Sequence, residues 1–159
     1  HSAEYVGDIQ TYNKVKEVFT NDAPVLTLIN FLEVDANAHQ NDWENYLRTL
    51  KNCDDYANEL WKFIQADSVM GGKTTLLITN DHGRHLDGIK DGFKSHGDNC
   101  EGCRHISLLA MGPDFKQDAI TTEEGELIDI SATIAELLGF CMPSTRGRIL
   151  TEMFVQPKP

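Results

Sequence analysis

Apolar residues follow two alternating patterns along the chain. Spacing of three or four positions, as on one face of a helix, is found over residues 9–20, 43–66 and 129–138. Nearly continuous apolar runs cover residues 25–34, 74–80 and 106–111, which is typical of strands buried on both faces. Strands separated by helices predict right-handed crossovers. We therefore predict an α/β fold, a three-layer sandwich in which a mainly parallel sheet is packed between helices.

Polar residues with metal-binding side chains follow two of these runs directly. Asp35 and His39 follow the first run, and the adjacent Asp81 and His82 follow the second. In an open α/β sheet, functional residues gather at the carboxyl ends of the strands, so these residues predict one cleft that holds two metal ions. A charged pair placed at the end of a buried strand is costly unless something binds it. The alternative is that Asp35 caps the next helix and His39 is simply exposed.

A long polar, glycine-rich loop covers residues 83–104, and loops of this length inside a compact domain are usually functional. His96 within the loop and His105 just after it are both candidates for a third ligand, since catalytic zinc typically has three protein ligands. Arg84 and His85 are candidates for facing an anionic substrate. For His85, simple exposure to solvent is the favoured expectation.

The four cysteines fall into two groups. Cys53 and Cys141 lie in amphipathic stretches and are predicted to be small core residues. Cys100 and Cys103 form C-E-G-C in the polar loop, where a local disulfide, half of a zinc site and a redox dithiol are competing hypotheses. A zinc site with four cysteines would need a second close pair, and the sequence has none. We favour a disulfide that closes the loop.

Composition narrows the classes of partner. The 159 residues are predicted to form a single domain segment, 1–159, with 14 basic against 25 acidic side chains and a net charge of −11. This charge argues against binding to a nucleic-acid polymer. No apolar run approaches the roughly 20 residues of a membrane span. The cysteines do not decide the compartment; we favour a periplasmic or extracellular location over the cytoplasm.

Several short motifs occur in an order that is similar to a known family: V-D-A-N-A-H, I-T-N-D-H-G-R, S-H-G-D-N, A-M-G-P-D-F and D-I-S-A-T-I-A-E-L-L-G. Over about residues 24–154 they resemble the C-terminal part of the alkaline phosphatase superfamily. That superfamily includes phosphatases, nucleotide pyrophosphatases/phosphodiesterases, sulfatases and cofactor-independent phosphoglycerate mutase. The resemblance implies that Asp35, His39 and one loop histidine bind a first metal, and that Asp81 and His82 bind a second. S-H-G-D-N and A-M-G-P-D-F are spaced as in the phosphodiesterase-like branch, which favours His96 over His105.

The resemblance also implies an activity. We expect a metal-dependent hydrolase of phosphate or related esters, of the phosphatase, phosphodiesterase or sulfatase class. It would use two divalent cations. Zinc is the favoured metal, and manganese, calcium and magnesium are the alternatives. The substrate would be a small-molecule or nucleotide-like phosphate or sulfate ester. The alternatives are a phosphotransferase like phosphoglycerate mutase and a non-catalytic metal-binding relic domain.

The Ser, Thr or formylglycine nucleophile of the superfamily has no counterpart before Asp35. We therefore expect the chain to be the C-terminal segment of a larger enzyme. Alone, it is expected to be inactive.

Overall fold

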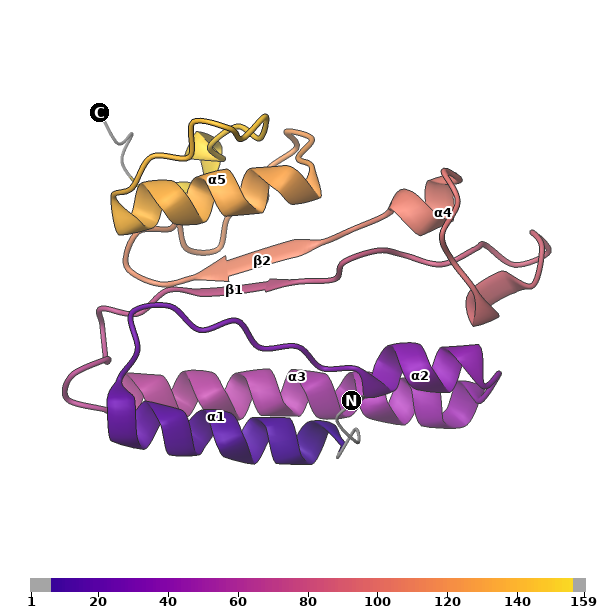
Figure 1. Ribbon diagram of the computed structural model, residues 1–159, viewed down its shortest axis with the longest axis horizontal. Helices are drawn as coiled ribbons and strands as arrows, with labels where there is room; N and C mark the ends of the chain where they lie inside the picture. The colour runs from indigo at the N-terminus through magenta and orange to yellow at the C-terminus, as the bar shows by residue number, and fades with distance from the viewer. Residues whose placement is uncertain (1–6, 156–159) are drawn as a thin grey trace. The chain divides into compact units, whose positions relative to one another are not determined.

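The computed structural model describes residues 7–155, and these residues form two compact units (Figure 1). The first unit contains residues 7–72 and 82–105, and the second contains residues 73–81 and 106–155. The described residues form both helices and a sheet, as predicted. No helix among residues 7–155 is long and apolar enough to cross a membrane. That residues 1–159 are a single domain segment stays a prediction.

Three helices make up most of the first unit. They are α1 (Asp8–Asp22), α2 (Glu33–His39) and α3 (Trp43–Ala66), and both α1 and α2 contact α3. The predicted helices at 9–20 and 43–66 are confirmed. Their apolar faces meet in a small core, made of Val15, Phe19, Leu60, Ile64 and Met70. This core holds α1 against α3.

The predicted strand at 25–34 is wrong. The segment is extended as far as residue 32 but joins no sheet among the described residues, and Val25 and Leu28 are 87% and 95% exposed. α2 then begins at Glu33, because the buried carboxylate of Asp8 accepts hydrogen bonds from the backbone N–H groups of Leu32 (2.8 Å) and Glu33 (3.0 Å). These N–H groups belong to the first turn of a helix, which has no internal partners for them.

The second unit contains a small sheet of two strands, β1 (Leu76–Thr79) and β2 (Leu108–Met111). The predicted strands at 74–80 and 106–111 are confirmed, but they pair antiparallel, with Leu76 opposite Met111. The mainly parallel sheet of a three-layer sandwich is therefore wrong for the described residues. The physical reason lies in the connection. A parallel pair needs a crossover, usually a helix, whereas β1 and β2 are joined by a loop with only short helical turns, η1 (Gly92–Lys94) and α4 (Glu101–Arg104).

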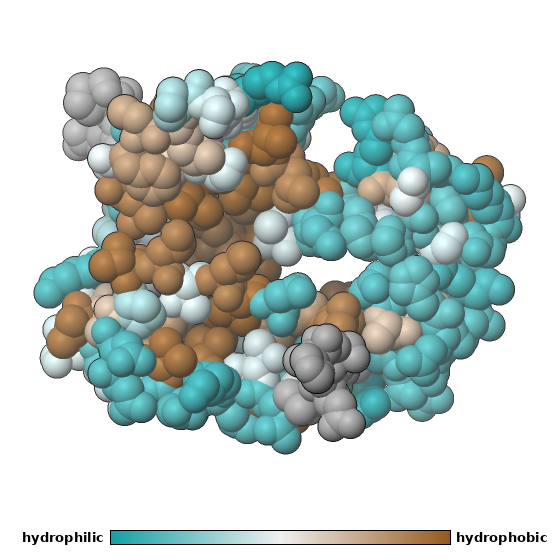
Figure 2. Space-filling view, viewed as in Figure 1, coloured by the Kyte–Doolittle hydropathy of each residue, from teal (hydrophilic) through white to brown (hydrophobic). Residues whose placement is uncertain are grey.

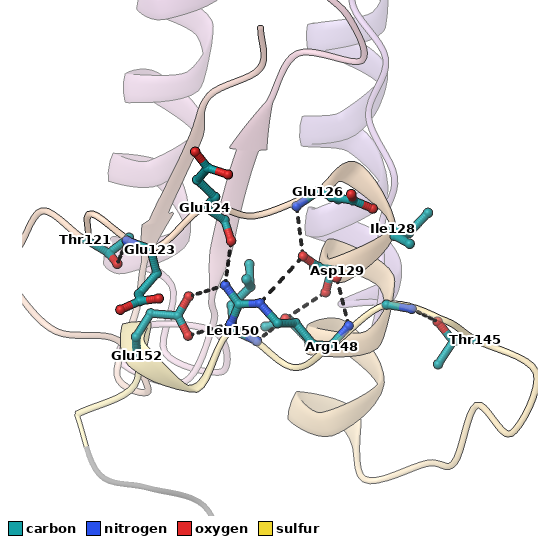
Figure 3. A network of polar contacts seen from close by, with 12 residues as sticks. Thr121, Glu123, Glu124, Glu126, Ile128, Asp129, Thr145, Arg148, Leu150 and Glu152 are labelled. Atoms are coloured by element: carbon teal, nitrogen blue, oxygen red, sulfur yellow. Dashed lines mark hydrogen bonds and ion pairs between the residues drawn. The ribbon is translucent and has the colours of Figure 1, made fainter. Parts of the chain in front are cut away.

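A buried carboxylate organises the rest of the second unit (Figure 3). Helix α5 (Leu127–Leu138) confirms the predicted helix at 129–138, and Asp129 in its first turn is 5% exposed. Asp129 accepts hydrogen bonds from the backbone N–H groups of Glu126 and Arg148, both at 2.8 Å. Arg148 in turn forms an ion pair with Glu152, which belongs to the short helix η2 (Thr151–Met153). The D-I-S-A-T motif therefore includes a residue that binds the C-terminal segment to α5.

The two isolated cysteines differ from the prediction that both are core residues. Cys53 in α3 is half-buried, and Cys141, just after α5, is exposed. Cys141 follows Gly139, which ends the helix with a left-handed φ of 71° and directs the chain away from the apolar face of α5. The core prediction is wrong for Cys141.

Candidate metal centre

Asp35 and His39 lie on one face of α2. They are four residues apart, and His39 Nε2 is 3.5 Å from Asp35 Oδ2. Asp35 lies inside the first turn, and the carboxylate that caps this helix belongs to Asp8. The alternative that Asp35 serves as the cap is therefore wrong. Hydrophilic side chains cover the end of the first unit that contains α2 and the loop of residues 83–104 (Figure 2).

His96 joins this pair from the loop after η1. Its Nε2 atom is 3.5 Å from Asp35 Oδ1 and 3.2 Å from His39 Nε2. Bonds of about 2.0–2.1 Å to a tetrahedral cation place the ligand atoms about 3.3–3.4 Å from one another. The two histidines approach different oxygens of the Asp35 carboxylate, and one ligand atom from each of the three residues lies within 4.8 Å of the other two. The donor atoms are thus close to this spacing, and the three residues can hold a divalent cation.

His82 extends the group of imidazoles. Its ring stacks on that of His96, with centroids 3.6 Å apart and planes inclined by 17°. His82 Nδ1 is 2.9 Å from the carbonyl oxygen of Gly83, which can only accept, so in the neutral ring Nδ1 carries the proton and Nε2 the lone pair. Burial, and secondarily the neighbouring His82, hold the pKa of His96 below its ordinary value. His96 is therefore neutral at pH 7, which is the form that binds metals.

Arg84 contacts both α2 and the loop. Its side chain is 12% exposed, pairs with the Asp35 carboxylate, and donates hydrogen bonds to the backbone oxygens of Asp35 (3.3 Å) and Phe93 (3.1 Å). The guanidinium thus holds the carboxylate in place beside the two histidines. That Arg84 also faces a substrate stays a prediction.

The other predicted ligands are placed differently. Asp81 follows β1 and belongs to the second unit, and its role as a ligand stays a prediction. His105 follows α4, where its backbone N–H bonds to Gly102. Within residues 7–155, the donor group around Asp35 and His39 includes His96 and not His105.

A second group of metal-binding side chains was not recognised from the sequence as one cluster. It consists of His85, Asp98, Cys100 and Cys103, whose donor atoms all lie within 4.8 Å of one another. The His85 side chain is 3% exposed, so the expectation of an exposed histidine is wrong. Cys100 and Cys103 are free thiols, so the favoured disulfide is absent from the structure. One sequence feature could have indicated this cluster. It is the segment H-G-D-N-C-E-G-C, in which Asp98 lies two positions before Cys100.

Comparison with known proteins places the chain in a family. The model of the metalloenzyme superfamily matches residues 4–142. A phosphopentomutase of Herpetosiphon aurantiacus is 28% identical over 149 residues, which cover 93% of this chain and 34% of that protein. A 2,3-bisphosphoglycerate-independent phosphoglycerate mutase of Legionella pneumophila (strain Corby) is 27% identical over 126 residues, which cover 79% of this chain and 23% of the mutase.

The chain thus spans about a third of the phosphopentomutase and less than a quarter of the phosphoglycerate mutase. No solved structure matches it significantly. The family model, in contrast, covers most of the chain, including both donor groups. The protein therefore belongs to the metalloenzyme superfamily, the alkaline phosphatase-like group that its motifs indicate.

Proposed function

We propose that this chain provides the cation-binding part of an enzyme that moves a phosphoryl group between positions of a small phosphate ester. Two kinds of observation support the proposal. The Asp35 carboxylate lies 3.5 Å from the Nε2 atoms of both His39 and His96, and the three residues bring their donor atoms close enough together to share a divalent cation. Both relatives described above are phosphomutases, which favours the phosphotransferase alternative over the hydrolase expected from the motifs.

Asp35, His39 and His96 would hold the first cation, and His82, whose ring stacks on that of His96, would contribute to a second. One carboxylate with two imidazoles suits zinc or manganese better than calcium or magnesium, which prefer oxygen ligands alone. A cation bound there would act as a Lewis acid on a phosphoryl oxygen.

The chain's own residues prepare this site. The hydrogen bond from His82 Nδ1 to the Gly83 carbonyl fixes the tautomer and orients the ring, as partners of metal ligands commonly do. Arg84 keeps Asp35 beside the histidines and brings a permanent positive charge close to where a phosphate dianion would bind. These groups favour a small anionic ester as the substrate.

The donor group of Asp35, His39 and His96 supports the proposal most strongly, and metal titration tests it. Calorimetry with zinc and with manganese should show affinity that falls by at least about 10-fold in His39→Gln and in His96→Gln, because each variant removes a direct ligand. His105→Gln is the matched control and should bind as the unchanged chain does. Equal affinity for all four proteins would contradict the proposal.

A product assay separates the mutase from the hydrolase. The complete product of the coding sequence and the 159-residue chain are each incubated with a pentose 1-phosphate and manganese or zinc. We expect the complete product to form the isomeric phosphate without releasing inorganic phosphate. The chain alone, which spans about a third of the phosphopentomutase, should show little turnover. Release of inorganic phosphate as the main product would favour the hydrolase instead.

A further inference from the structure

The loop of residues 83–104 contains a group of donor atoms that the proposed phosphoryl-transfer site does not use. His85, Asp98, Cys100 and Cys103 each present one ligand atom, and these four atoms lie within 4.8 Å of one another. We propose that they form a second, structural metal site that binds one zinc ion. This inference is independent of the proposed function, because none of the four residues belongs to the Asp35 group.

The imidazole of His85 is the first observation that points to a ligand. Its Nδ1 atom lies 3.2 Å from Asp91 Oδ1 and 3.1 Å from Ser95 Oγ. Its Nε2 atom is buried and has no hydrogen-bond partner, although the side chain is only 3% exposed. Buried polar atoms are nearly always paired. When Nδ1–H donates to Asp91, the neutral ring presents the Nε2 lone pair to the interior, where Asp98 Oδ2 lies 3.3 Å away as a second ligand atom.

The two cysteines are preorganised by the backbone around them. Asp98 Oδ1 accepts a hydrogen bond from the Cys100 N–H (3.0 Å), and Cys100 Sγ accepts one from the Cys103 N–H (3.4 Å). A bound cation would favour the thiolate, which is the form that binds metal. Gly102 lets the turn pack closely, since a Cβ atom there would lie 2.2 Å from the Arg84 carbonyl oxygen, immediately before His85.

The donor set selects zinc. Two thiolates, one imidazole and one carboxylate suit a tetrahedral zinc ion, whereas calcium and magnesium bind oxygen ligands. Zn–S bonds of about 2.3 Å and Zn–N bonds of about 2.0 Å place the ligand atoms roughly 3.3–3.8 Å apart. His85 Nε2 and Asp98 Oδ2 are 3.3 Å apart, and all four donor atoms lie within 4.8 Å of one another. Four protein ligands leave no open position, so the site is structural rather than catalytic.

Charge balance supports the same assignment. Two thiolates and a carboxylate leave the zinc complex with one negative charge, and Lys90 forms an ion pair with Asp98. The Lys90 side chain is 58% exposed, so it can remain beside the complex as a solvated counter-charge. The complex and Lys90 together are neutral.

Such a site would fix the position of the candidate catalytic loop. His96 lies between His85 and Asp98 in sequence, so ligands on both sides of it would be held by the same ion. A single zinc ion would therefore hold the two ends of the segment that presents His96 to Asp35. It would do so in place of the disulfide that the C-E-G-C spacing suggests.

Cobalt substitution of the reduced 159-residue chain tests the proposal. Cobalt(II) added to the metal-free chain should give intense thiolate-to-cobalt charge-transfer absorption in the near ultraviolet, and zinc should displace it. Cys100→Ser, at a partly exposed position that need not disturb folding, should remove most of this absorption. His85→Gln should weaken zinc binding by more than about 100-fold, because even partners outside the ligand shell contribute about 10- to 100-fold.

Two controls make the result specific. Cys141→Ser changes an exposed cysteine outside the cluster and should leave the absorption unchanged. The double variant Asp35→Asn/His39→Gln removes the other site and should also retain the absorption, so the two proposals fail independently. Absence of the charge-transfer absorption from the reduced, unchanged chain would overturn the zinc site. A Cys100–Cys103 disulfide that forms in the presence of equimolar zinc would overturn it as well.

Discussion

Arg84 shows how one side chain can set the geometry of the candidate metal centre. Its guanidinium pairs with the Asp35 carboxylate and donates to two backbone oxygens, one in α2 and one in η1. The planar fork of arginine allows these bonds to form together, which the single ammonium of lysine could not reproduce. Arg84 therefore positions Asp35 through direct contact.

Arg84→Met tests this role through stability. We expect the free energy of unfolding to fall by about 2–3 kcal/mol, because charged hydrogen bonds are lost and Asp35 is left without its ion pair. Chemical denaturation measures the change. The control is Arg48→Met, at an exposed position of α3 where the guanidinium bonds to the Asn45 side chain, and it should cost at most about 0.5 kcal/mol. Similar losses in the two variants would show that Arg84 has no special positioning role.

The sequence predicted the donors of the candidate centre better than those of the second cluster. Asp35, His39 and His96 were identified as candidates because strand-end chemistry and the family motifs indicate such residues. The involvement of His85 was not predictable, because its role depends on burial against Asp91 and Ser95. Burial of that kind follows from how the loop folds, and no spacing rule describes it.

At the scale of elements, the short helix α2 depends on a residue outside it. Asp8 is 1% exposed and accepts the N–H groups of Leu32 and Glu33 with both carboxylate oxygens. Helices of this length are marginal without such contacts. Asp8 thus connects the start of α1 to the helix that contains Asp35 and His39.

Asp8→Asn should destabilise the chain by about 1.5–3 kcal/mol, because the amide offers one acceptor oxygen where two N–H groups need one each. Metal affinity should also fall, since the first turn of α2 becomes less ordered. Chemical denaturation and zinc titration measure the two effects. Asp22→Asn, at the exposed end of α1, should change stability by no more than about 0.5 kcal/mol. The cap assignment is wrong if both variants behave alike.

The C-terminal segment of the second unit should respond to acid. The hydrogen-bonded ion pair with Arg148 holds the pKa of Glu152 below its ordinary value. A lowered pKa in the folded state means that the stabilisation is complete above about pH 4.5 and is lost as the pH falls through the folded-state pKa. The difference in unfolding free energy between the unchanged chain and Glu152→Gln should therefore shrink on acidification. A difference that is constant from pH 7 to about pH 3 would contradict this account.

The helices were predictable as elements, whereas the pairing of the strands was not. Apolar periodicity fixes which face of α3 or α5 is buried, and that information is local in the sequence. The direction in which β1 and β2 pair depends on the path of the loop between them, and an apolar run contains no information on that path. Residues 25–32 show the same limit. Their apolar composition predicted a buried strand, but among the described residues nothing covers Val25 and Leu28.

For the whole molecule, residues 25–32 contain three strongly exposed apolar side chains. Val25, Leu26 and Leu28 are 87%, 60% and 95% exposed, and hydrophobic side chains are widely exposed on the face drawn in Figure 2. Exposed apolar segments with free backbone groups favour association between chains. The net charge of −11 opposes association only through long-range repulsion that salt screens.

We therefore expect the chain to self-associate increasingly with salt, and Leu28→Lys to reduce this association. Light scattering at several protein concentrations measures it. Gln10→Lys, at an exposed position of α1, adds the same charge without altering the segment and is the control. An effect of the control equal to that of Leu28→Lys would mean that charge, and not the apolar segment, governs association.

The central claim is that Asp35, His39 and His96 form one metal centre. Anomalous diffraction from crystals of the chain grown with zinc, and separately with manganese, tests it most directly. We predict an anomalous peak about 2.0–2.2 Å from a carboxylate oxygen of Asp35 and from the Nε2 atoms of His39 and His96. The claim would be contradicted if a crystal fully loaded with metal showed no anomalous peak among these atoms and the Asp35 carboxylate contacted only Arg84.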